Sequence, residues 1–155
     1  MKFFRIAKAG HIGDLTGEGA RVNGGRWNEK GISVIYTAES LSLAALEYLV
    51  HLPLVLAPPD LKYRSFSVPD DTRVTNLPRT ALSPGWDAMP FQAETVRIGS
   101  EWARSARTLI LRVPSVIVPG EYNFIINPLQ AAFRKVRASR PLPFNFDDRI
   151  LKRKQ

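Results

Sequence analysis

The chain has 155 residues, 45% hydrophobic and 23% charged, with 22 basic and 14 acidic side chains that give a formal net charge of +8. This composition is typical of a single globular domain and excludes a disordered or collagen-like chain. The absence of cysteine excludes disulfides and thiolate catalysis, and no apolar run approaches the roughly 20 residues that cross a bilayer. No secretory signal is visible at the start, so we expect a cytoplasmic protein without membrane contact.

The first predicted element is a short strand at residues 3–7. The segment 11–31 that follows holds six glycines and is too polar and too glycine-rich for a helix or a central strand. A buried strand is predicted at 32–37, where β-branched and aromatic residues gather. Ser40 then precedes strong helix formers, so we expect it to cap a helix over 41–51 that the following prolines end.

The rest of the chain alternates apolar segments with proline-rich breaks. In order, the pattern predicts strands at 62–68 and near 73–76, a surface loop at 77–91, a helix at 93–106, strands at 108–113, 116–118 and 122–126, a short helix from residue 129, and a sheet edge at 144–151. Val96, Ile98, Trp102 and Ala103 are expected to share one side of the helix at 93–106. This mixture indicates an α+β fold in one domain over residues 1–155.

Glu47 does not fit a purely structural role. Its neighbours one helical turn away are Leu43, Ala44, Val50 and His51, so the carboxylate lies among apolar residues. Burying a carboxylate without a partner costs several kcal/mol. Glu47 therefore either faces the solvent edge of its helix, pairs structurally with an arginine, or serves a functional site.

The motif GGRWN, with Arg26 and Trp27, is the second anomaly. Its glycines allow a backbone to approach a ligand closely, and an arginine there can bind a diphosphate through two parallel hydrogen bonds. The same residues also make an ordinary turn, and neither a P-loop nor a GxGxxG spacing accompanies them.

Basic residues are concentrated in the C-terminal segment 129–155. This charge is interpreted either as a solvated segment that keeps the protein soluble or as a surface for an anionic partner. No helix-turn-helix, zinc finger or aromatic-interleaved RNA motif is present, so direct binding of nucleic acid is not expected.

Three motifs in fixed order, GGRWN, VIYTAES and ALEYLVH, followed by VPSVIVPGEYNFIINP, resemble the RES domain, which supplies the toxins of RES–Xre toxin–antitoxin modules. The resemblance covers about residues 4–128. It implies a fold similar to the ADP-ribosyltransferases of the diphtheria-toxin type and an enzyme that consumes NAD as its substrate, with no cofactor and no metal. It also implies a cognate Xre-type antitoxin that forms an inhibitory hetero-oligomer with the toxin.

The resemblance also assigns site residues. The family arginine, tyrosine, glutamate and serine fall on Arg26, Tyr36, Glu47 and Ser115, which are the expected catalytic residues. In this assignment Glu47 stabilises an oxocarbenium-like state, Arg26 clamps the diphosphate, Tyr36 stacks on nicotinamide or ribose, and Ser115 orients the substrate. The expected substrate-binding residues are Arg5, Arg26, Trp27, Tyr36, Ser115 and Asn123.

Three functions remain open at this point. The first is degradation of NAD by cleavage of the nicotinamide–ribose bond, through hydrolysis or phosphorolysis. The second is a protein ADP-ribosyltransferase with the same pocket. The third is a basic nucleic-acid-binding module, which predicts strongly salt-dependent binding and no NAD turnover.

Overall fold

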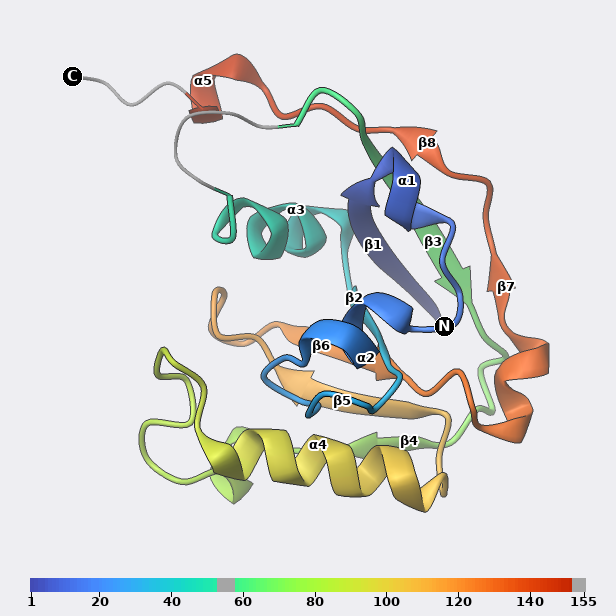
Figure 1. Ribbon diagram of the computed structural model, residues 1–155, viewed down its shortest axis with the longest axis vertical. Helices are drawn as coiled ribbons and strands as arrows, with labels where there is room; N and C mark the ends of the chain where they lie inside the picture. Colours follow the sequence, from blue (N-terminus) through green and yellow to red (C-terminus); the bar gives the residue numbers. More distant parts are fainter. Residues whose placement is uncertain (53–57, 152–155) are drawn as a thin grey trace.

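The computed structural model describes residues 1–52 and 58–151. Its strands form an eight-stranded mixed sheet in the order β4-β5-β6-β2-β1-β3-β7, with β8 also paired to β3 (Figure 1). The β4–β5 pair is parallel, and the other pairs are antiparallel. The strands are β1 (Lys2–Lys8), β2 (Ile35–Ala38), β3 (Leu61–Ser67), β4 (Val74–Asn76), β5 (Ile110–Pro114), β6 (Tyr122–Ile126), β7 (Arg137–Ala138) and β8 (Leu142–Pro143).

Helices and 3₁₀ turns cover this sheet. They are α1 (Ala9–Ile12), α2 (Glu18–Asn23), α3 (Leu41–Leu49), η1 (Arg79–Ala81), α4 (Ala93–Ser105), η2 (Ala131–Lys135) and α5 (Asp148–Leu151). The α3 helix packs on β1 and β2, and α4 runs alongside β4 and β5 (Figure 1). Within the described part of the chain, none of the helices is both long enough and apolar enough to span a bilayer.

Both faces of the sheet bury apolar side chains. On one face Phe3 stacks on Phe124 with their ring centroids 4.3 Å apart, at the centre of a cluster that includes Phe66. On the other face the three tryptophans join one cluster, and a smaller cluster lies beneath α3. Side chains alternate across each strand, so residues of β2 and β6 that share the α3 face can meet side chains from the helices.

The strands β1 and β2 separate after a single paired position. Phe4 lies opposite Ala38, whereas β2 stays paired with β6 over four positions and β1 stays paired with β3 over seven. The sheet is therefore split between β1 and β2. Side chains of both strands line this split, and the split therefore determines where the site described below lies.

Several predicted elements are confirmed. The strand at 122–126 has the predicted bounds, and β1, β3 and β4 extend or shorten theirs by a residue or two. Ser40 caps α3, because its hydroxyl accepts a hydrogen bond from the Leu43 amide at 3.0 Å. The helix ends at Leu49, and Pro53, expected to help end it, lies outside the described residues. The strand predicted at 32–37 is shorter and shifted, as β2 shows.

The prediction that 11–31 holds no helix is wrong, because α2 lies within it. The Asp14 carboxylate accepts hydrogen bonds from the Thr16 and Glu18 amides, at 2.8 and 3.0 Å, and so satisfies donors at the start of the helix. Gly17 supplies the left-handed residue before the helix, with φ of +74°, and a Cβ there would meet the Val34 carbonyl oxygen at 2.7 Å. The glycines thus shape the helix ends and leave a helical stretch between them.

Other predictions fail in the second half of the chain. Residues 116–118 form bends, not a strand, because Ser115 turns the chain there. Asn127 closes a local turn onto the Leu129 amide, and the helix expected from residue 129 is the 3₁₀ turn η2, capped by Gln130. The sheet edge expected at 144–151 is formed earlier, by β7 and β8, and α5 occupies the end of that range.

The burial of α4 and of the loop before it differs from what the sequence predicted. The helix buries Thr95, Gly99, Ser100, Trp102 and Ala103. Val96 and Ile98, expected on the buried side, are only half-buried. The loop expected to wrap the surface at 77–91 also contributes to the core, because Trp86 inserts into the tryptophan cluster.

Candidate active site

The carboxylate of Glu47 accepts two hydrogen bonds from side chains far away in sequence. The Asn123 amide donates to Oε1 at 2.6 Å, and the Ser115 hydroxyl donates to the same oxygen at 2.9 Å. Glu47 comes from α3, Asn123 from β6 and Ser115 from the residue after β5. The structure therefore unites three of the predicted site residues around one oxygen, and the partners of Glu47 are neutral donors.

Ser115 is oriented by its own backbone surroundings. Its hydroxyl oxygen accepts hydrogen bonds from the Ile117 and Val118 amides, at 3.0 and 3.1 Å. Both amides occupy acceptor sites of the hydroxyl, so its single proton is directed to Glu47. The side chain is 6% exposed. Ser115 is thus a fixed donor to the Glu47 carboxylate. The bends at residues 116–118 bring the two amides to its hydroxyl oxygen.

Tyr36 connects β2 to the GGRWN motif. Its hydroxyl accepts a hydrogen bond from the Trp27 amide at 3.0 Å and donates one to Asn28 Oδ1 at 2.7 Å. A Cβ at Gly25 would lie 2.7 Å from this hydroxyl, so glycine is required for the approach. Burial raises the pKa of Tyr36, so the phenol stays neutral. The tyrosine thereby fixes the backbone on both sides of residue 27.

Arg26 turns its guanidinium toward the loop before α4. Nη1 donates to the Trp86 carbonyl at 2.6 Å, and Nη2 donates to the Ala88 carbonyl at 3.1 Å. Burial lowers the pKa of Arg26, while the carboxylates of Asp87 and Glu47 oppose that change.

The split between β1 and β2 holds a cavity of about 240 Å³. Arg5 from β1 and Tyr36 from β2 line it, together with Asp14 and glycines at both ends of α2. Arg5 donates through Nη1 to the Asp14 carbonyl at 3.0 Å. Burial lowers the pKa of Arg5; the Asp14 carboxylate opposes this change and the neighbouring Arg64 adds to it. Within the described residues its other N–H groups have no protein acceptor, so they are available to an anion.

Trp27 lies in the core and not on the cavity. It is 3% exposed and packs in the cluster with Trp86 and Trp102. The expectation that it binds substrate is therefore corrected: its indole is enclosed by apolar side chains, and its contribution to the site is the amide that Tyr36 binds.

Sequence reasoning missed Asp14 and Asn28. Asn28 is 1% exposed and its amide donates to three backbone carbonyls, while its oxygen accepts from Tyr36. The signal for Asn28 was its place in GGRWN, and that for Asp14 was the spacing of Asp, Thr and Glu at a helix start. Both residues hold the loop that frames the cavity.

Fold and site together define a class: an α+β protein with a split sheet and a hydrogen-bonded carboxylate beside it. The chain matches the RES domain over residues 2–147 and belongs to this family. It is 38% identical over 156 residues, 97% of each chain, to a protein of Sphingobium sp. (strain YBL2) named Prs ADP-ribosylating toxin. It is 37% identical over 152 residues to a protein of Yersinia enterocolitica named Toxin Res, covering 97% of this chain and 99% of that one.

A solved structure shares the fold. This is the crystal structure of the M. tuberculosis MbcT–MbcA toxin–antitoxin complex, and the superposition has a TM-score of 0.67 with 20% sequence identity. It covers 91% of this chain and 82% of the other. At this identity the likeness concerns the fold alone.

Proposed function

We propose that this chain is an enzyme that cleaves the bond between nicotinamide and ribose in NAD, and that it is the toxin of a toxin–antitoxin pair. One observation carries the proposal: Glu47 Oε1 is fixed by Ser115 and Asn123. The names of the relatives, Prs ADP-ribosylating toxin and Toxin Res, support the toxin role. The ADP-ribosyltransferase-like fold that the family resemblance implies is part of this proposal.

Cleavage of a glycosidic bond passes through an oxocarbenium-like state with positive charge on the sugar. A carboxylate held in place before the reaction stabilises that charge without reorganising. Both hydrogen bonds to the carboxylate go to Oε1, and within the described residues Oε2 receives none. In this mechanism Oε2 faces the ribose, where the ionised carboxylate accepts a hydrogen bond from a ribose hydroxyl and stabilises the developing positive charge.

The cavity offers a place for the phosphates. Arg5 supplies guanidinium donors there, and a guanidinium pairs well with phosphate oxygens. Binding sites for drug-sized ligands usually measure about 300–1,000 Å³, so a cavity of about 240 Å³ holds part of a dinucleotide. We propose that the remainder extends past Tyr36 toward Glu47. Stacking by Tyr36 stays a prediction, and the diphosphate contact predicted for Arg26 is weighed below against its contacts with loop 85–91.

The acceptor distinguishes two forms of this function. Water or inorganic phosphate gives free ADP-ribose or its 1″-phosphate, whereas a protein acceptor gives a labelled macromolecule. The relative named Prs ADP-ribosylating toxin favours the second form. Purified chain incubated with adenine-labelled NAD, with and without phosphate and cell extract, separates them by where the label appears. Intact NAD under all conditions would contradict both.

Ser115→Ala is expected to lower NAD turnover by about tenfold with the fold intact. It removes one neutral donor to Glu47 and leaves Asn123 in place, a loss of about 1.4 kcal/mol of transition-state stabilisation. Initial rates at saturating NAD measure it. Ser139→Ala, at an exposed position away from Glu47, is the matched control for activity and is expected to keep the wild-type rate. Equal rates for Ser115→Ala and the wild type would show that Ser115 does not act through Glu47.

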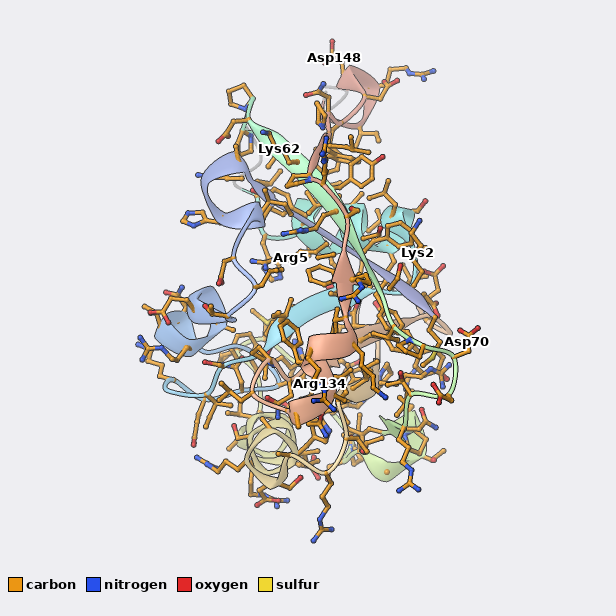
Figure 2. The ribbon with its side chains drawn as sticks, turned by 90° about the vertical axis from the view of Figure 1, so that its right-hand side faces the viewer. Lys2, Arg5, Lys62, Asp70, Arg134 and Asp148 are labelled. Carbon is orange, nitrogen blue, oxygen red and sulfur yellow. The ribbon has the colours of Figure 1, made fainter. Side chains whose placement is uncertain are left out.

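We propose an Xre-type antitoxin as the partner and the cytoplasm as the location. A protein that drains NAD must be held inactive by its host, and the net charge of +8 steers an acidic segment onto the surface. Exposed cations, including Arg134, line the C-terminal segment on the face shown in Figure 2. The complex of this chain with its antitoxin, purified as one species, is expected not to turn over NAD, and the free chain is expected to turn it over once the antitoxin is removed. Equal turnover by the complex and the free chain would refute inhibition by occlusion.

A further inference from the structure

The loop 85–91 contacts Arg26 along most of its length, and Arg26 follows Gly24, which lines the cavity. Besides the two short carbonyl contacts, Nη2 lies 3.4 Å from the Asp87 carbonyl and 3.3 Å from Met89 Sδ. The guanidinium carbon also lies 5.4 Å from the centre of the Phe91 ring. One side chain thus contacts five residues of a loop that lies 60 or more positions away in sequence.

The loop has few other ties to the rest of the protein. Its own backbone hydrogen bonds are local turns, from Trp86 to Ser83 and from Ala88 to Gly85. The Trp86 side chain is buried, but Met89 and Phe91 beyond it are 67% and 40% exposed. Among the described residues, the side-chain hydrogen bonds that reach the loop beyond Trp86 from outside come from Arg26, so Arg26 fixes the tip of the loop.

The other end of Arg26 is fixed as well. Tyr36 binds the Trp27 amide and stands against Gly25, so the backbone on both sides of Arg26 is held to β2. Arg26 consequently joins the sheet, next to the cavity that Tyr36 lines, to the loop, and within the described residues its charge is stabilised by carbonyl dipoles instead of an ion pair. Arg26 therefore holds the loop at a fixed position relative to the sheet.

We propose that Arg26 is a positioning residue that fixes loop 85–91 as one wall of the active site. This role differs from the diphosphate clamp predicted from the sequence, because the Nη atoms are already engaged by carbonyl oxygens. Loss of Arg26 frees Met89 and Phe91 from the site and lowers NAD turnover through the loop. The effect on activity rests on the proposed function, whereas the anchoring itself does not.

Hydrogen exchange in the free protein tests the anchoring directly. The Trp86 and Ala88 amides are the reporters, since both are hydrogen-bonded within the loop. Arg26→Ala is expected to speed their exchange by about tenfold or more, and Arg26→Lys by less, because lysine still reaches one carbonyl. Arg97→Ala, which removes an exposed arginine paired with Glu101 on α4, is expected to leave both amides unchanged. Unchanged exchange in Arg26→Ala and Arg26→Lys would overturn the proposal.

Titration with ADP tests whether Arg26 also holds the diphosphate. Arg26→Ala is expected to bind ADP within about threefold of the wild type, whereas Arg5→Ala is expected to lose tenfold or more. Equal losses in the two variants would overturn the assignment of Arg26 to the loop alone. Failure of the wild type to bind ADP would count against the proposed NAD site, and the exchange experiment would still decide the anchoring.

Discussion

Glu47→Gln is expected to reduce nicotinamide release from NAD by at least about 100-fold, in a protein that unfolds at the wild-type urea concentration. The glutamine carbonyl still accepts the hydrogen bonds from Ser115 and Asn123, so the packing of α3 on the sheet is kept. What is lost is the negative charge, and an amide NH₂ takes the place of Oε2. Removal of one electrostatic contact of this kind typically costs 100-fold to 1,000-fold in rate.

The matched control is Glu101→Gln. Glu101 is an exposed residue of α4 that pairs with Arg97 at 3.0 Å, so the same chemical change is made on the surface. We expect wild-type turnover from this variant, since exposed ion pairs contribute little to stability. A folded Glu47→Gln protein with wild-type turnover would exclude Glu47 as the catalytic carboxylate.

Gly99→Ala is expected to lower the free energy of unfolding by about 3 kcal/mol, the largest effect on stability in this account. Gly99 lies on the buried side of α4, where a Cβ would stand 2.0 Å from the Trp27 carbonyl oxygen and 2.7 Å from its carbonyl carbon. These are backbone atoms, so no flexible side chain can move aside. Either α4 moves away from the sheet or the segment next to Arg26 shifts.

Urea unfolding followed by tryptophan fluorescence measures the change, because all three tryptophans lie in the cluster that α4 covers. Gly10→Ala is the control: Gly10 is in α1, and a Cβ there meets nothing within 4 Å. Its midpoint is expected at or slightly above the wild-type value, since alanine favours the helix. A Gly99→Ala midpoint equal to that of the wild type would contradict the close contact between α4 and Trp27.

The elements that local chemistry decides were predictable from the sequence. Ser40 and the helix formers after it fix α3, and β-branched and aromatic residues favour β6, because capping and strand propensity act within a few residues. In segment 11–31 the number of glycines led to a wrong prediction, because Gly17 and Gly24 cap the two ends of α2. Ser115 gave no signal of bends at 116–118, since its hydroxyl, and not a strand ladder, binds the following amides.

The site itself was predictable in part. Glu47 stood out by its apolar neighbours, and the family motifs named Ser115 and Asn123, which the structure brings to its carboxylate. The partners of Arg26 were not predictable, because backbone carbonyls 60 or more positions away carry no mark in the sequence. Trp27 was expected to bind substrate because it stands in GGRWN, whereas its side chain lies in the core. The residues that bury it are distant in sequence, so the motif alone did not show this. Assignment of residues 1–155 to one domain stays a prediction.

We propose that Glu47, fixed by Ser115 and Asn123, takes part in the cleavage of nicotinamide from NAD. The most direct measurement is the time course of free nicotinamide and remaining NAD when purified chain, free of any partner, is mixed with NAD. We expect one nicotinamide released for each NAD lost, with release reduced by at least about 100-fold in Glu47→Gln. NAD recovered intact from the wild type, or nicotinamide released equally by folded Glu47→Gln, would contradict it.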